Sequence, residues 1–182
     1  KSVYRATTLV DGSRPENSGE HSWHLALYAL VLADQAAPDV DVNRVIRMLL
    51  LHDLVEIDVG DHPIDQAFDH AAVALAEARA AERLFGLLPV DIGAPLRAFW
   101  QVFEEAATAD ARHAKRLDHS QPMFQVLDAP RPRADHLTVV CDNLATGRAA
   151  RLAQEWPEVY ARAFAQTRAE TPPDTPALAA GL

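Results

Sequence analysis

The chain has 182 residues, of which 49% are hydrophobic, so it is long enough to form one domain with a sizeable core. Its formal net charge of −9 argues against binding to a nucleic acid polymer, because such proteins normally carry a basic surface. The single cysteine, Cys141, excludes an internal disulfide framework and fits a reducing compartment. No apolar run approaches the ~20 residues that span a bilayer, so we expect a cytoplasmic protein without a membrane segment.

Helical patterns account for nearly all of the chain, and no alternating strand pattern of useful length occurs. In chain order, the expected helices cover residues 16–36, 39–56, 71–88, 94–109, 111–128, 134–154 and 157–170. We therefore predict one all-α domain over residues 1–170, a compact bundle of about six or seven helices. Residues 171–182 are rich in proline and are expected to form a mobile tail.

Two details of these helices can be checked against a structure. In the first segment, Trp23, Leu27, Leu30 and Val31 recur at helical spacing, which indicates an amphipathic helix. In the fourth segment, Pro95 is expected near the first turn, where proline is favoured.

The stretch LLLHDLVEIDVGD, residues 49–61, places a histidine and four acids directly after a run of leucines. His52 and Asp53 are adjacent and Glu56 follows one turn later, so the three side chains can reach one point beside the helix. A neutral imidazole beside a carboxylate is a natural ligand pair for a divalent metal ion. Gly60 is expected to end the helix, and Asp61 follows in the turn.

Two ligands from one helix hold a divalent ion poorly, so the remaining ligands must come from other segments. His21, at the start of the preceding helix, and Asp118, in the segment AKRLDHSQP, are the candidates. A single His-Asp pair is usually a surface acid beside a hydrogen-bonded histidine, and only the surrounding pattern favours a metal site here. The other histidines are assigned mainly to such structural roles: His24, His62, His70, His113, His119 and His136.

Three segments together resemble the HD-domain metal-dependent phosphohydrolases, and among them the YfbR-like 5'-deoxynucleotidases. They are RPENSGEHSWHLAL at residues 14–27, RMLLLHDLVEIDVGD at residues 47–61 and AKRLD at residues 114–118. The resemblance implies an all-α bundle of the HD-domain type around one divalent metal ion: Mn, Co, Fe, Ni, Zn or Mg. It places the metal ligands at His21, His52, Asp53 and Asp118.

The resemblance also implies an enzyme that releases phosphate from a small-molecule substrate, a (deoxy)ribonucleoside 5'-monophosphate. Glu56 would orient or deprotonate the attacking water, and Asp61 would position the water or the sugar. Arg5 would bind the phosphate, and Lys115 would be a further substrate contact. The resemblance further implies a homodimer.

The chain departs from the deoxynucleotidase pattern at two positions. Ala6 stands where a tryptophan follows the phosphate-binding arginine, and Ile64 stands where a threonine follows the glycine-acid turn. We therefore expect weaker discrimination against ribose.

Two other functions stay open at this point. One is a catalytically weak protein that binds metal and nucleotide. The other is a two-metal HD phosphodiesterase or oxygenase, which would need further ligands such as His62, His70 or His113.

Overall fold

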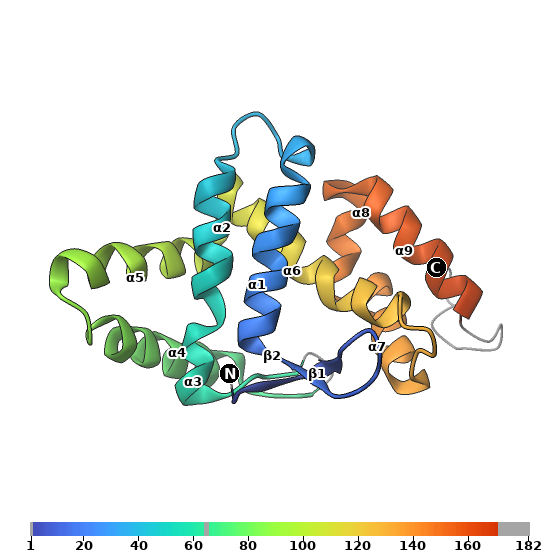
Figure 1. Cartoon of the computed structure of the whole chain (residues 1–182), viewed down its shortest axis with the longest axis horizontal. Helices are drawn as coiled ribbons and strands as arrows, with labels where there is room; N and C mark the ends of the chain where they lie inside the picture. Colours follow the sequence, from blue (N-terminus) through green and yellow to red (C-terminus); the bar gives the residue numbers. More distant parts are fainter. Residues whose placement is uncertain (1, 64–65, 171–182) are drawn as a thin grey trace. The chain divides into compact units, whose positions relative to one another are not determined.

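The computed structural model describes residues 2–63 and 66–170 (Figure 1). Ile64 and the predicted tail at residues 171–182 therefore lie outside the described residues. The chain divides into two compact units. The first unit comprises the residues up to Ala6 together with Glu16–Leu117, and the second comprises Thr7–Pro15 and the residues from Asp118 onward. The single domain over residues 1–170 stays a prediction.

Helices dominate the described residues, which confirms the all-α prediction. The elements in chain order are β1 (Tyr4–Thr8), β2 (Pro15–Asn17), α1 (Ser18–Val31), the 3₁₀ turn η1 (Ala33–Gln35), α2 (Val42–Leu51), the 3₁₀ turn η2 (His52–Val55), α3 (Glu56–Val59), α4 (His70–Phe85), α5 (Val90–Glu105), α6 (Ala109–Leu127), α7 (Ala134–Ala145), the 3₁₀ turn η3 (Arg148–Arg151), α8 (Leu152–Glu155) and α9 (Pro157–Glu170). Of the described helices, seven have ten or more residues, and α3 and α8 have four each.

The chain begins with a small sheet that the sequence analysis did not expect. Strands β1 and β2 pair with each other, but they have only five and three residues. Strands this short give no usable alternation of polar and apolar residues, which explains why the pattern was missed.

Helix α1 forms where it was predicted, but its buried face differs from the one that the hydrophobic spacing indicated. Trp23, Leu30 and Val31 are 63%, 59% and 70% exposed. The buried side chains of α1 are instead small or polar, with one leucine: Ser18, His21, Ser22, Leu25, Ala26 and Ala29. A helix with a polar site at one end of its inner face does not show the hydrophobic stripe of an ordinary core helix.

Helices α1 and α2 run antiparallel side by side, so the start of α1 lies next to the end of α2 (Figure 1). Leu25 on α1 and Val45, Met48 and Leu49 on α2 are completely buried. Full burial of a side chain of this size contributes about 1.5–3 kcal/mol, so this packing holds the two helices firmly together. Residues 52–61, which follow the leucine run, are thereby placed beside the first turn of α1.

The turn η2 is anchored from its other side by α4 and α5. Val55 belongs to a buried cluster with Ala80, Ala81 and Phe85 on α4 and Trp100 on α5. Helix α5 approaches the end of α4 so closely at Gly93 that a Cβ atom there would lie 2.2 Å from the backbone oxygen of Phe85.

The expected start of α5 at Pro95 was wrong. The helix begins at Val90, directly after Pro89, and Pro95 lies inside it. A proline inside a helix removes one backbone hydrogen bond without necessarily ending the helix, and the earlier Pro89 marks the boundary.

The second unit has its own core. Its buried residues are Met123, Val126, Leu127, Leu137, Val140, Leu144, Ala149, Leu152 and Ala163.

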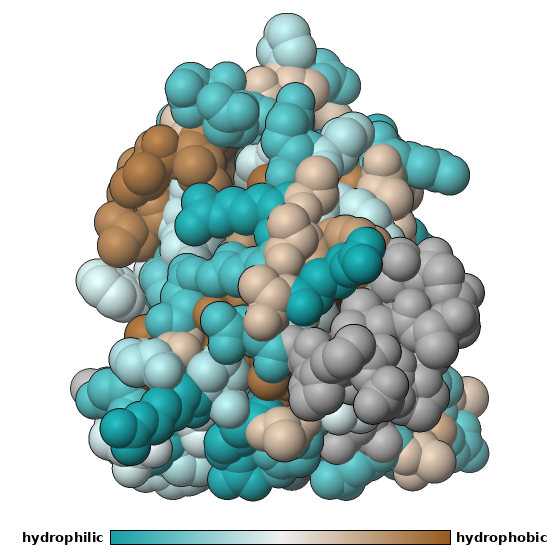
Figure 2. Space-filling view, turned by 90° about the vertical axis from the view of Figure 1, so that its right-hand side faces the viewer, coloured by the Kyte–Doolittle hydropathy of each residue, from teal (hydrophilic) through white to brown (hydrophobic). Residues whose placement is uncertain are grey.

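The face drawn in Figure 2 is mostly hydrophilic, and its most hydrophobic residues gather at one edge. Across the described ranges, no helix is both long enough and apolar enough to cross a membrane.

Candidate metal centre

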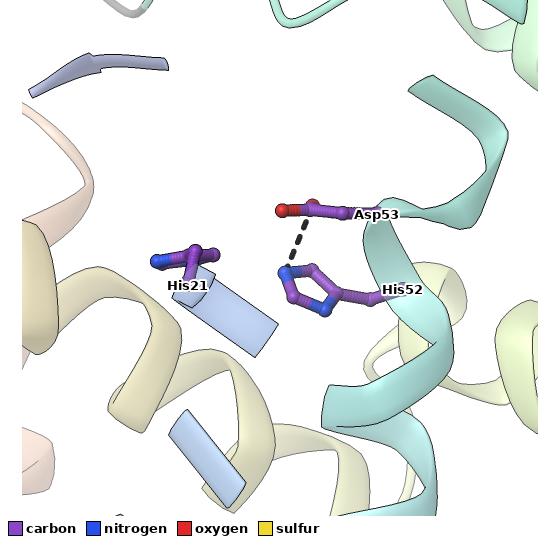
Figure 3. Close-up of side chains that lie close together, drawn as sticks. All are labelled: His21, His52 and Asp53. Carbon is purple, nitrogen blue, oxygen red and sulfur yellow. Dashed lines mark ion pairs between the residues drawn. The ribbon is translucent and has the colours of Figure 1, made fainter. Parts of the chain in front are cut away.

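Three of the predicted ligands, His21, His52 and Asp53, point toward one another (Figure 3). Each offers one ligand atom, and these atoms all lie within 4.8 Å of one another. Within residues 2–63 and 66–170, no other group of three histidine, cysteine or acidic side chains meets this condition. Both histidines are buried, and the side chain of Asp53 is 10% exposed.

The local backbone explains why His52 is buried while the adjacent Asp53 faces Arg5. Helix α2 ends at Leu51, and His52–Val55 form a 3₁₀ turn rather than continuing the predicted α-helix to Glu56. In 3₁₀ geometry, side chains three residues apart are aligned. His52 and Val55 are accordingly the two buried residues of the turn. Asp53 and Glu56 have the same spacing, and both approach the guanidinium of Arg5.

The first turn of α1, which carries His21, is fixed by a capping box. The side chain of Asn17 accepts hydrogen bonds from the backbone N–H groups of Gly19 and Glu20, at 3.0 and 3.1 Å. The backbone N–H of Asn17 in turn donates to the carboxylate of Glu20 at 3.2 Å. These contacts satisfy three backbone donors at the start of the helix, and a cap of this kind stabilises a protein by about 1 kcal/mol.

The contacts of His52 fit a bound cation. Its Nδ1 lies 2.9 Å from the carbonyl oxygen of Leu49, which can only accept, so Nδ1 carries a proton. Its Nε2 lies 2.9 Å from Oδ1 of Asp53. In a neutral ring, Nε2 would present a lone pair to the carboxylate, and two acceptors this close repel each other. A proton or a metal ion held by both atoms removes that repulsion. Two imidazoles and a carboxylate are also suitable ligands for a divalent metal.

Arg5 supplies positive charge on the acidic side of the site. Its Nη1 donates to Oδ2 of Asp53 at 2.8 Å and lies 3.8 Å from Glu56 and 3.7 Å from Asp61. Burial alone would raise the pKa of Asp53, but the charge and hydrogen bond of His52 and the charge of Arg5 hold it below its usual value. Asp53 is therefore ionised and available as a ligand.

Glu56 is the acid of the site whose pKa shifts in the opposite direction, upward. Its side chain is 11% exposed, and its Oε2 accepts a hydrogen bond of 2.6 Å from the hydroxyl of Ser18. Burial, followed by the negative charge of Asp53, raises the pKa of Glu56 to about 7, while Ser18 and Arg5 act in the opposite direction. A carboxyl group with this pKa can exchange a proton near neutral pH.

This shift predicts that Glu56 destabilises the metal-free protein at alkaline pH. The folded state holds the proton of Glu56 more tightly than the unfolded chain, whose ordinary glutamate pKa is 4.5. The contribution of the protonated Glu56 to the free energy of unfolding is therefore complete below pH 4.5 and is lost as the pH rises through about 7. Glu56→Gln should raise the free energy of unfolding of the chelator-treated protein at pH 8 by about 1–3 kcal/mol.

Denaturant unfolding at pH 4.5 and pH 8 measures this effect. The matched control is Glu105→Gln, an exposed acid at the end of α5 that accepts a hydrogen bond from Gln101 at 2.8 Å. The control should change stability little at either pH. If Glu56→Gln is only as stable as the parent at pH 8, or less stable, the folded state does not disfavour the charged form of Glu56.

The other predicted site residues are Asp61, Lys115 and Asp118. Asp61 follows Gly60, whose φ of +80° ends α3, and it lies close to Arg5 as described. Lys115 lies over the ring of Phe103, with Nζ 3.8 Å from the centroid, and pairs with Glu104 at 3.1 Å. Asp118 belongs to the second unit, so its role as a ligand of the metal stays a prediction.

The histidines that a second metal would require have other surroundings. The rings of His62 and His70 lie 5.4 and 4.5 Å from the ring of Phe68. Nδ1 of His113 lies 3.2 Å from Nη2 of Arg116. Burial and the charge of Arg116 lower the pKa of His113 to about 4, and a neighbouring guanidinium disfavours a second cation there.

Sequence reasoning missed two residues that contact the site. Ser18 binds Glu56, and the buried carboxylate of Glu16 lies 3.4 Å from Nδ1 of His21. Both are in the segment RPENSGEH, from which the sequence analysis assigned only His21 to the site. A charged residue directly before a helix cap gives no sign in the sequence that it is buried.

Comparison with known proteins places the chain among similar sequences. The model of the HD domain family matches residues 1–160. The chain is 29% identical over 112 residues to a human protein named 5'-deoxynucleotidase HDDC2, which covers 62% of this chain and 53% of that protein. It is 30% identical over 112 residues to the Bos taurus protein of the same name, with 62% and 53% covered. The chain thus spans about half the length of these curated relatives.

A solved structure is similar over most of the chain. It is described as a predicted metal-dependent phosphohydrolase from Magnetospirillum magnetotacticum MS-1 and is 39% identical in sequence, with a TM-score of 0.76. The similarity covers 93% of this chain and 87% of the other.

Proposed function

Because the chain belongs to the HD domain family, we propose that it is a metal-dependent phosphohydrolase that releases phosphate from nucleoside 5'-monophosphates. The observation that carries the proposal is the convergence of His21, His52 and Asp53 beside the acid Glu56 and the cation Arg5. The nucleotide substrate is inferred from the curated relatives, which are named 5'-deoxynucleotidase.

His21, His52, Asp53 and Asp118 would hold one divalent ion. When bound, the ion supplies a water of lowered pKa and offsets the charge of the phosphate. Zn, Mn, Co, Fe and Ni all accept two imidazoles with carboxylates, and Mg prefers oxygen ligands, so the donor set favours a transition metal.

Glu56 is the proposed base. Its raised pKa suits proton transfer at neutral pH, and the hydrogen bond from Ser18 to Oε2 fixes the orientation of its carboxylate. Glu56 would take the proton of the attacking water, and Asp61 would position that water or the sugar of the substrate. Both acids lie within 4 Å of Arg5, so the base and the phosphate-binding group are adjacent.

Arg5 is the proposed phosphate contact. A guanidinium has five N–H donors in a planar fork that matches the oxygens of a phosphate, so it can bind a phosphate while keeping its contact with Asp53. Lys115 is a second candidate contact. Its ammonium is held by Glu104 and Phe103, and the ring of Phe103 lies 4.9 Å from the ring of His52.

A phosphate-release screen over all deoxy- and ribonucleoside 5'-monophosphates, with each of several divalent metals, tests this function. We expect release from monophosphates that depends on an added metal and stops with a chelator. If metal binds but no monophosphate is hydrolysed, the function is that of a binding protein instead.

Substrate scope should differ from that of a strict deoxynucleotidase. Ala6, which is exposed in β1, takes the place of the expected tryptophan and leaves no bulky side chain after Arg5. A steric gate of this kind discriminates by only about 1–3 kcal/mol, so its loss should bring deoxy- and ribonucleotides within about tenfold. Values of kcat/KM for dAMP against AMP, and for dCMP against CMP, under one metal measure the preference. A deoxy preference well above tenfold would mean that another residue excludes the 2'-hydroxyl.

The homodimer and the cytoplasmic location belong to the same proposal. Size-exclusion chromatography with light scattering would test the first of these. A monomer at micromolar concentration would contradict it.

A further inference from the structure

We propose that Glu16 is a positioning residue for the metal: its carboxylate holds the proton of His21 on Nδ1 and so directs Nε2 of that ring to the ion. This inference rests on the proposed metal site and adds to it a residue that is not a ligand itself. Glu16 lies in β2, directly before the cap of α1, and is 1% exposed.

Glu16 contacts Nδ1 of His21, whereas Asp53 contacts Nε2 of His52. Oε2 of Glu16 lies 3.4 Å from Nδ1 of His21, and both side chains are almost completely buried, at 2% and 0% exposure. Strand β2 ends at Asn17 and α1 begins at Ser18, and the capping box around Asn17 stabilises the backbone between Glu16 and His21. The contact is therefore built into the start of the helix rather than made by a mobile surface chain.

The chemical reason is the two-nitrogen character of imidazole. A neutral ring has one N–H and one lone pair, and the group that accepts from the N–H decides which nitrogen is left to bind metal. The carboxylate of Glu16 can only accept, so it favours the proton on Nδ1 of His21. A carboxylate in this position also makes the other nitrogen a stronger donor to a metal.

His52 also has an oxygen beside Nδ1, but this oxygen belongs to the main chain. There the carbonyl of Leu49 accepts from Nδ1 at 2.9 Å. Each histidine of the site thus has an oxygen near Nδ1: a main-chain carbonyl 2.9 Å from that of His52, and the carboxylate of Glu16 3.4 Å from that of His21. Only the second can be removed by substitution, which makes Glu16 the residue through which the idea can be tested.

The test compares Glu16→Ala and Glu16→Gln with Glu20→Gln. Glu20 lies on the same first turn and accepts from the backbone of Asn17, a role that glutamine also fills, so it controls for changes to the helix end. Dissociation constants for Zn²⁺ and Mn²⁺ are measured by competition with a chromophoric chelator. The tautomer of His21 in the metal-free protein is read from the ¹⁵N chemical shifts of its ring.

We expect Glu16→Ala to weaken metal binding by about 10–100-fold and to remove the preference of His21 for a proton on Nδ1. Glu16→Gln, whose carbonyl oxygen can still accept, should keep the tautomer and weaken binding less. Glu20→Gln should leave both readouts unchanged. Metal affinity within about twofold of the parent in a folded Glu16→Ala variant would overturn the proposal.

The parent protein alone keeps the idea testable if Glu16→Ala does not fold. A metal-free parent in which His21 carries its proton on Nε2 would overturn the proposal without any variant. The result also separates this inference from the proposed function. Absence of nucleotide hydrolysis contradicts the function but leaves the affinity and tautomer readouts intact.

Discussion

Replacing Glu56 by alanine is expected to lower kcat/KM for nucleoside monophosphates by about 10²–10⁴-fold, the usual cost of losing a general base. The metal should remain bound, because Glu56 is the proposed base and not a ligand. Its carboxylate is oriented by Ser18 at 2.6 Å, and its pKa of about 7 suits the role. Steady-state kinetics and metal content, measured on the same preparation, test both parts.

The matched control for this change is Glu105→Ala, which removes an exposed carboxylate from the end of α5 and should leave the rate unchanged. Two outcomes would contradict the assignment in different ways. Loss of the metal from Glu56→Ala would make Glu56 a ligand. A rate within about threefold of the parent, with metal bound, would remove it from catalysis.

Substitution of Asp53 by asparagine should remove both metal and activity. Asp53 is the acid that joins the two sides of the site, since Oδ1 lies 2.9 Å from Nε2 of His52 and Oδ2 accepts from Arg5 at 2.8 Å. A metal contributes several kcal/mol to transition-state stabilisation, and each 1.36 kcal/mol is tenfold in rate. We therefore expect a loss of at least ~10³-fold that added metal does not restore at ordinary concentrations.

Asp58→Asn is the control for that variant, with the same chemical change in the same segment. Asp58 pairs with Arg83 at the surface, and this pairing lowers its pKa. Its substitution should leave metal content and rate unchanged. Full metal occupancy in Asp53→Asn would show that Asp53 serves only as the partner of Arg5.

Local patterns predicted the helical class, and the seven long helices agree with it. The resemblance to the HD-domain phosphohydrolases pointed to His21, His52 and Asp53, which lie together in the structure; that they bind a metal stays a prediction. The motif after the leucine run was informative because charged residues next to a buried helix end have few structural reasons to be there.

Other features depended on three-dimensional contacts that have no local signal. The inner face of α1 was misassigned because its polar residues face the site and its large apolar residues are exposed. The change from α-helix to 3₁₀ geometry at His52 aligns Asp53 with Glu56, and no residue in that stretch marks the change. Glu16 and Ser18 could be recognised only when β2 was placed beside α1 and η2.

The measurement that tests the central claim most directly is anomalous diffraction from crystals of the protein loaded with Zn²⁺ or Mn²⁺. We predict one peak bound by His21, His52, Asp53 and Asp118, with Zn-ligand distances of about 2.0–2.2 Å. A peak at other residues, two peaks, or an Asp118 carboxylate beyond coordination distance would contradict the site as described.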